Sequence, residues 1–165
     1  MIQIETKRTL LRRVKISDLN SLKLILMDEK VMAFTGFRRA QTEDESIELI
    51  KKWKNDPGVW VLITRDLEEL IGWFMLKNTI SNDYPEIGFM LNQLFWNQGY
   101  ATEIGMELMK YAFNDLRASK VIACVDLDNM ASIKVLEKLG MKRSKNFPSK
   151  ENLIYYEKSL PSLID

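Results

Sequence analysis

The chain has 165 residues, a length that fits one domain around a single hydrophobic core. It is 46% hydrophobic and 28% charged, and its net charge of +1 at pH 7 argues against a protein that holds nucleic acid or a membrane through a broad electric field. The chain has no histidine, and Cys124 is its one cysteine. These counts exclude Ser-His-Asp and Cys-His catalytic sets, His-based metal sites and an internal disulfide.

The first third of the chain predicts a strand followed by two helices. Residues 2–14 alternate loosely between apolar and polar and predict the strand. Ser17 is a candidate N-cap for a helix whose apolar positions are Leu19, Leu22, Ile25 and Leu26. Thr42-Glu43-Asp44-Glu45 has the form of a capping box, and the helix behind it ends at Asp56-Pro57-Gly58.

The remaining two thirds predict a mixed sheet with two further helices. Strands are expected at 59–64 and 70–76, joined as a hairpin, and then at 86–91, 120–125, 141–147 and 153–157. Helices are expected at 98–114 and 128–139, and Gly140 ends the second. The order β-α-α-β-β-β-α-β-α-β-β predicts one α+β domain spanning residues 1–165, a mixed sheet flanked by helices.

A strand, a loop containing glycine and a helix follow one another from residue 86 to residue 114. The first N–H groups of a helix have no intrahelical partner, and the helix dipole favours negative charge there. Gly99 lets a phosphate approach the backbone, Ala101 is small, and the Thr102 hydroxyl adds a donor. On its own, the pattern is typical of a plain helix-opening turn as well as of an anion site.

A second motif, Asn129-Met130-Ala131-Ser132, opens a helix directly after the strand at 120–125. The Asn129 side chain is placed either to cap that helix or to hydrogen-bond the amide groups of a ligand. Ser132 faces the same way as Val135, Leu136 and Leu139, where its hydroxyl either bonds to a carbonyl one turn earlier or faces a ligand.

In their order and spacing, these segments resemble the GNAT superfamily of N-acetyltransferases, and in particular its ribosomal-protein N-terminal acetyltransferase (RimJ/RimL-type) branch. The resemblance is carried by residues 4–12, 86–91, 95–103 and 129–141. It implies a GNAT-like α+β fold with a mixed, mostly antiparallel sheet of about six to seven strands, about four flanking helices and a splayed central strand pair.

The resemblance further implies that acetyl-CoA is the co-substrate. Its pantetheine arm would enter between strand 89–91 and strand 121–125 and pair with the backbone of Met90 and Leu91. The backbone of residues 98–102 would cradle the pyrophosphate. Asn129 would contact the pantetheine, and Ser132 would lie near the thioester sulfur. The full set of implied cofactor contacts is Phe89, Met90, Leu91, Trp96, Asn97, Gln98, Gly99, Tyr100, Ala101, Thr102, Asn129, Ser132 and Leu136.

Three positions bear on how well the chain fits the family pattern. Trp96 occupies the first motif position, as is common in the RimJ/RimL-type branch. Asn97 stands where that branch usually has glycine, and asparagine tolerates a left-handed backbone if one is required there. Leu136 stands where many members have a tyrosine general acid, so that role is either vacant or passes to Ser132.

The family reaction is direct attack of an amine on the thioester, which needs a neutral amine and a stabilised oxyanion. A free α-amine has a pKa of ~8 and a lysine ~10.4, so the α-amine is easier to deprotonate. Without histidine, the base is a carboxylate, a tyrosine or a water chain. Glu86 is the first candidate; Glu103, Tyr84 and Asp83 follow. The backbone N–H of Met90 or Leu91 is the expected oxyanion donor, and Ser132 or water would protonate the leaving thiolate.

The acceptor amine is left open between a protein N-terminus, such as that of a ribosomal protein, and a lysine, a polyamine, an amino acid or an aminoglycoside. Residues 31–42, with Phe34, Phe37, Arg38 and Arg39, and the loop 78–85 are expected to wall its site. A GNAT-fold module that binds CoA without catalysis is the alternative. We expect a monomer or homodimer and no metal. One cysteine, no membrane-length apolar run and no signal-peptide pattern favour the cytoplasm.

Overall fold

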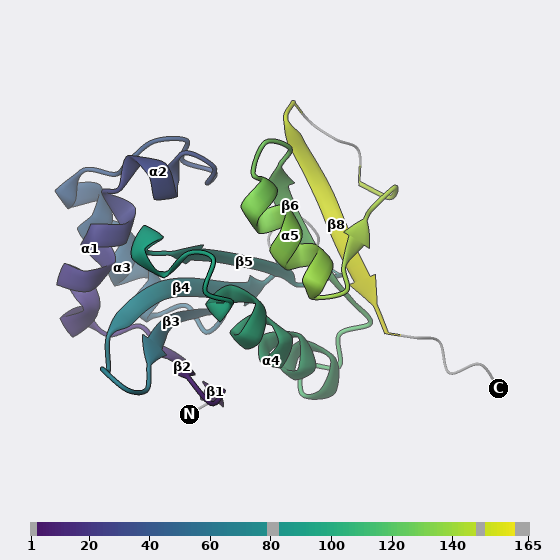
Figure 1. Ribbon diagram of the computed structural model, residues 1–165, viewed down its shortest axis with the longest axis horizontal. Helices are drawn as coiled ribbons and strands as arrows, with labels where there is room; N and C mark the ends of the chain where they lie inside the picture. Colours follow the sequence, from purple (N-terminus) through teal and green to yellow (C-terminus); the bar gives the residue numbers. More distant parts are fainter. Residues whose placement is uncertain (1–2, 79–82, 148–150, 161–165) are drawn as a thin grey trace.

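The computed structural model describes residues 3–78, 83–147 and 151–160 (Figure 1). Ile2 of the expected first strand and residues 79–82 of the expected acceptor loop lie outside these ranges. In chain order the strands and α-helices are β1 (Ile4–Glu5), β2 (Thr9–Arg13), α1 (Leu19–Leu26), α2 (Glu29–Met32), α3 (Glu43–Lys54), β3 (Val59–Thr64), β4 (Leu70–Lys77), β5 (Glu86–Leu91), α4 (Tyr100–Asn114), β6 (Lys120–Asp126), α5 (Met130–Lys138), β7 (Lys142–Arg143) and β8 (Leu153–Ser159).

The described strands form one sheet of eight in the order β1-β2-β3-β4-β5-β6-β8-β7. Every neighbouring pair is antiparallel except β5 and β6, which are parallel. The expected mixed, mostly antiparallel α+β fold is therefore confirmed, with one more strand than expected. The extra strand arises because the first expected strand breaks into the β1–β2 hairpin, where the Thr6 hydroxyl accepts the N–H groups of Arg8 and Thr9 (3.2 and 2.9 Å).

Two details of the N-terminal helices differ from the sequence prediction. Ser17 is not the N-cap of α1, because a 3-10 turn, η1 (Ile16–Asp18), precedes it and Asp18 organises the turn. The Asp18 carboxylate accepts the Lys15 N–H at 2.7 Å and pairs with Arg12 at 2.7 Å. Helix α2 is an additional four-residue helix, and the Asp28 side chain caps it. The capping box of α3 is confirmed, with Thr42 and Glu45 each accepting the other's backbone N–H.

The sheet packs a hydrophobic cluster on each face. On one face, α4 and α5 cover side chains that include Phe74, Ile87, Leu91 and Val121. On the other, α1 and α3 pack against side chains of β3, β4 and β5 such as Val61, Trp73 and Met90. Strand residues alternate between these faces, so neighbouring residues of β5 serve different layers. No helix in the described part of the chain is long and apolar enough to cross a membrane.

The central parallel pair is splayed. The ladder between β5 and β6 has one residue pair among the described residues, Glu86 with Ile122, beside a hydrogen bond from the Ile122 N–H to the Pro85 carbonyl at 3.0 Å. Beyond this point the two strands diverge, and Figure 1 shows β5 and β6 running in clearly different directions. The carboxyl-terminal half of β5 consequently has an edge that β6 does not pair.

Candidate functional site

The gap between the diverging strands β5 and β6 is called the splay below. The register of β5 decides which backbone groups point into it. The Asn92 N–H donates to the Ile71 carbonyl at 2.9 Å, and Met90 pairs with Trp73 two residues further along β4. Hydrogen-bonded and non-hydrogen-bonded pairs alternate in an antiparallel ladder, so the backbone groups of Met90 point toward β4. Those of Phe89 and Leu91 point toward β6. Of the two residues expected to pair with the pantetheine arm, Leu91 directs its backbone groups away from β4, whereas the Met90 backbone pairs with β4 and its side chain packs in the α1–α3 layer.

Side-chain bonds to the backbone shape the loop between β5 and α4. The Trp96 indole N–H donates to the Leu91 carbonyl at 2.8 Å, and the Gln98 amide donates to the Leu94 carbonyl at 2.8 Å. Between Leu91 and Trp96 lies a 3-10 turn, η2 (Gln93–Phe95), which the Asn92 side chain caps. Trp96, at the first motif position, thus ties the loop to the end of β5.

Two residues of this loop adopt the left-handed backbone conformation. Asn97 has φ +60° and Gly99, the N-cap of α4, has φ +81°. The Glu103 N–H donates the first intrahelical bond, to the Gly99 carbonyl at 3.0 Å, so the N–H groups of Tyr100, Ala101 and Thr102 lack intrahelical acceptors. Asparagine is the substitute for glycine that the left-handed region tolerates best, which explains Asn97 at a glycine position.

We expect Asn97→Gly to leave the free energy of unfolding nearly unchanged and Asn97→Ala to lower it by about 1 kcal/mol. Alanine is strained in the left-handed conformation and lacks the local hydrogen bonding of the asparagine side chain. Urea unfolding of the two variants beside the wild type measures the difference. A larger loss for glycine than for alanine would show that the Asn97 side chain, rather than its backbone conformation, matters.

The second motif begins α5 and borders the same face of the sheet. The Asn129 side-chain oxygen accepts the Ser132 N–H at 3.1 Å and caps the helix. This bond uses the amide oxygen, so the amide nitrogen can serve a ligand. Ser132 is half-buried, whereas Leu136 is buried in the core between α4, α5 and the sheet. Leu136 therefore provides packing at the position where a tyrosine would donate a proton.

Glu86 lies where β5 and β6 begin to part. It is 7% exposed, and burial raises its pKa to about 7, although a hydrogen bond from the Cys124 backbone and the charge of Lys77 oppose the rise. Strand alternation places its side chain on the face opposite α4 and α5. A buried carboxyl group that titrates near neutral pH is suited to take a proton from an amine.

Two neighbours of Glu86 on the same face come from β6 and β8. Cys124 pairs with Tyr155 across these strands and shares a side-chain hydrogen bond with it. Burial, followed by the charge of Glu86, raises the pKa of the Cys124 thiol. The thiol thus stays protonated near neutral pH. Tyr155 was missed because only the register of β8 brings it to the site.

The loop between α2 and α3 reaches the end of β6. Arg38, in a left-handed backbone conformation, forms an ion pair with the buried carboxylate of Asp126. A backbone hydrogen bond from Asp128, followed by Arg38, lowers the pKa of Asp126. Phe34 and Phe37, two of the expected acceptor-wall residues, are exposed on this loop. The ion pair therefore joins the N-terminal helical layer to the strand beside Glu86.

The other candidate bases have structural partners. Burial raises the pKa of Glu103, but hydrogen bonds from Thr6 and Arg8 outweigh it and the net pKa is lowered. The Tyr84 ring lies under the Lys120 ammonium, 5.1 Å from its centroid. Asp83 is exposed. Among the described residues, no group of three or more Cys, Asp or Glu side chains could hold a metal ion.

Comparisons with known proteins identify the family. Residues 8–142 match the acetyltransferase (GNAT) domain family. The chain is 32% identical to the FsC-acetyl coenzyme A-N(2)-transacetylase of Aspergillus fumigatus, over 75% of this chain and 58% of that enzyme. Its fold is similar to a GNAT-family acetyltransferase from Bacillus anthracis (TM-score 0.85, 24% identity, 96% of this chain and 98% of the other). It is also similar to RimL, a ribosomal L7/L12 alpha-N-protein acetyltransferase in complex with coenzyme A (TM-score 0.80, 16% identity, 96% and 98%).

The chain therefore belongs to the GNAT acetyltransferase family. It is an acetyl-CoA-dependent N-acetyltransferase. The left-handed residues before α4 and the backbone edge of β5 fit the pyrophosphate and the pantetheine arm of that co-substrate.

Proposed function

We propose that this protein acetylates an α-amine, such as the N-terminal amine of a protein, with Glu86 as the general base. The observation that supports this proposal most strongly is the burial of Glu86 at the point where β5 and β6 part, which raises its pKa to about 7. Its position at the splay suits a side chain that receives the amine on one face while the cofactor approaches from the other. The acceptor would enter from the side of Cys124 and Tyr155.

The chain's own groups supply the remaining steps. Bound acetyl-CoA supplies the thioester carbonyl that the amine attacks. The N–H groups of Phe89 and Leu91 are directed at the splay, where one of them donates to the carbonyl oxygen as its charge develops. Ser132 or a water molecule returns a proton to the thiolate. Residues 97–102 bind the pyrophosphate through their backbone, and Asn129 binds the pantetheine.

Proton transfer energies favour an α-amine over a lysine. Moving a proton from an α-ammonium of pKa ~8 to a carboxylate of pKa ~7 costs about 1.4 kcal/mol. The same transfer from a lysine ammonium of pKa ~10.4 costs roughly 4.6 kcal/mol. The difference corresponds to a factor of over ~100 in the population of the neutral amine at equal binding. The similarity in fold to RimL, which acts on a protein α-amine, supports the same choice.

A small-molecule amine is the second candidate acceptor. The relative from Aspergillus fumigatus is named for transfer to an N(2) nitrogen of FsC, and it is more similar in sequence than RimL is. A polyamine, an amino acid or an aminoglycoside would present the same primary amine to Glu86. The two acceptor classes share the proposed chemistry and differ in what the 33–42 loop contacts.

The test is thiol release from acetyl-CoA with a panel of amines. The panel holds a lysine-free peptide with a free N-terminus, the same peptide N-acetylated and carrying one lysine, spermidine, an amino acid and an aminoglycoside. We expect thiol release to be fastest with the first peptide at equal acceptor concentration. If a small molecule is preferred instead, the acceptor is that small molecule and not a peptide α-amine. Thermal stabilisation by acetyl-CoA without thiol release from any amine would favour the non-catalytic CoA-binding module.

A further inference from the structure

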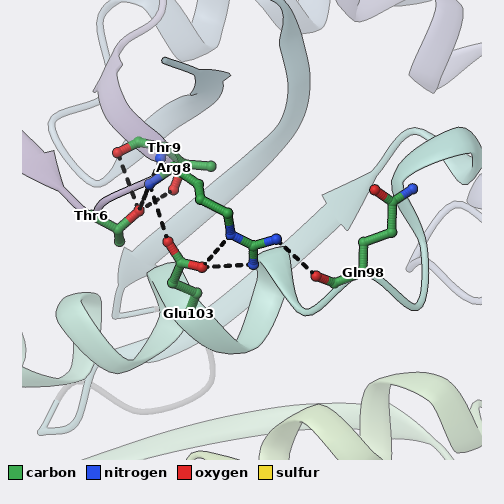
Figure 2. Close-up of polar contacts among 5 residues, drawn as sticks. All are labelled: Thr6, Arg8, Thr9, Gln98 and Glu103. Carbon is green, nitrogen blue, oxygen red and sulfur yellow. Dashed lines mark hydrogen bonds and ion pairs between the residues drawn. The ribbon is translucent and has the colours of Figure 1, made fainter. Parts of the chain in front are cut away.

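Arg8, in the turn between β1 and β2, reaches across to the start of α4 (Figure 2). Its Nε and Nη2 lie 2.6 Å from the same carboxylate oxygen of Glu103, and its Nη1 donates to the Gln98 carbonyl at 3.1 Å. Its guanidinium carbon also lies 4.3 Å from the Tyr100 ring centroid. One side chain therefore contacts three residues of the cofactor loop and helix, the nearest of them 90 residues away in the sequence.

The bond to Gln98 fixes the orientation of one peptide group. The C=O and N–H of a planar trans peptide point in opposite directions, and the described chain has no cis peptide bond. Because the Gln98 carbonyl points at Arg8, the Gly99 N–H points away from Arg8. Gly99 and the N–H groups after it are the expected donors to the pyrophosphate. Arg8 thus sets the direction of the first of these donors from behind the loop.

Arg8 also compensates a charge that would oppose an anion. Glu103 lies in the first turn of α4, next to the proposed pyrophosphate position, and its pKa is lowered so that it is ionised at neutral pH. Without a partner this carboxylate would repel a diphosphate. The fork of the arginine side chain satisfies both the carboxylate and the Gln98 carbonyl, which a lysine ammonium cannot do in one geometry.

We propose that Arg8 is a positioning residue for the cofactor's pyrophosphate. It holds the Gln98–Gly99 peptide with its N–H toward the anion and neutralises Glu103, without contacting the reacting atoms. This inference rests on the proposed cofactor site, but it concerns binding of the diphosphate and not the identity of the acceptor amine.

The test compares two donors, acetyl-CoA and acetyl-pantetheine, the second of which lacks the pyrophosphate. For Arg8→Met we expect KM for acetyl-CoA to rise about 10-fold, with kcat within twofold of the wild type. The kinetic constants for acetyl-pantetheine should stay within twofold. Equal losses with both donors would overturn the proposal, because they would mark a general structural defect. An unchanged KM for acetyl-CoA would overturn it as well.

Two matched variants separate positioning from charge. Arg8→Lys keeps the positive charge but loses the forked hydrogen bonding of the guanidinium group. We expect it to raise KM for acetyl-CoA by at least half as much as Arg8→Met does, on a logarithmic scale. Glu103→Gln keeps the arginine and removes the negative charge, and we expect an unchanged or lower KM for acetyl-CoA. Full rescue by lysine, or a loss with Glu103→Gln equal to that of Arg8→Met, would overturn the proposal.

Direct binding distinguishes this inference from the proposed function. Titration calorimetry of coenzyme A and of pantetheine needs no acceptor amine and no turnover. We expect Arg8→Met to weaken the binding of coenzyme A about 10-fold and the binding of pantetheine less than twofold. If the wild type binds coenzyme A but no amine is acetylated, the proposed function fails while Arg8 is still tested. If the substitution weakens the binding of both ligands equally, the Arg8 proposal fails while the acetyltransferase assignment stands.

Discussion

Replacing Glu86 by glutamine is expected to lower the rate of thiol release at saturating acetyl-CoA and amine by at least ~10-fold, and general bases of this kind contribute typically ~100- to 10,000-fold. Glutamine has nearly the same shape but cannot accept the proton that the acceptor amine must lose. The matched control is Glu48→Gln on α3, where the carboxylate side chain is 72% exposed and pairs with Lys51. We expect the control to keep its full rate.

The same substitution should stabilise the protein increasingly as the pH rises above about 5. Burial raises the pKa of Glu86 from 4.5 to about 7, so between these values the folded state binds more protons than the unfolded state. Stability is therefore lost as pH rises through this window, by about 3 kcal/mol when the loss is complete. Glu86→Gln lacks that loss, so its advantage in urea unfolding should grow from about pH 5 to 8. A less stable and equally active variant would mark Glu86 as a structural carboxylate.

The second large effect is expected for Gly72→Ala on β4. A Cβ at Gly72 would lie 2.7 Å from the Met90 carbonyl oxygen and would clash with a methyl carbon of Leu91. The carbonyl is backbone, so β5 must shift away from β4 to make room. We expect a loss of about 1–3 kcal/mol in unfolding free energy. Turnover should fall with it, because the displaced strand carries the backbone groups aimed at the splay.

Gly36→Ala is the matched control for stability, since a Cβ at Gly36 meets no atom within 4 Å. Urea unfolding of both variants, together with acetyl-CoA turnover below the transition, measures stability and activity separately. If Gly72→Ala were as stable as Gly36→Ala and as active as the wild type, the contact between β4 and β5 would be looser than the register indicates, and the backbone assignment of Phe89 and Leu91 would lose its basis.

Local sequence signals predicted most of the fold. The capping box at Thr42, the left-handed tolerance of Asn97 and the stop at Gly140 are short-range features, and each is found where the sequence indicates it. The break of the first strand into β1 and β2 was missed because it depends on the Thr6 hydroxyl, and α2 because four residues are too few to show helical periodicity.

The candidate site was predictable only in part for a related reason. Glu86 and the loop at 97–102 lie on segments with recognisable order, but Arg8, Arg38 and Tyr155 reach the site through contacts between distant parts of the chain. No spacing rule connects Arg8 with Gln98 or Arg38 with Asp126. Hydrophobic periodicity also cannot tell which of Phe89, Met90 and Leu91 faces the splay, because that depends on strand register.

The most direct test of Glu86 as the general base is the pH dependence of kcat for the wild type and for Glu86→Gln, with a lysine-free peptide acceptor, between about pH 5 and 9. We expect the wild-type kcat to rise with pH through an inflection near 7, where Glu86 loses its proton. The variant should lack that inflection. The same inflection in both proteins would contradict the assignment, because another group would then be accepting the proton.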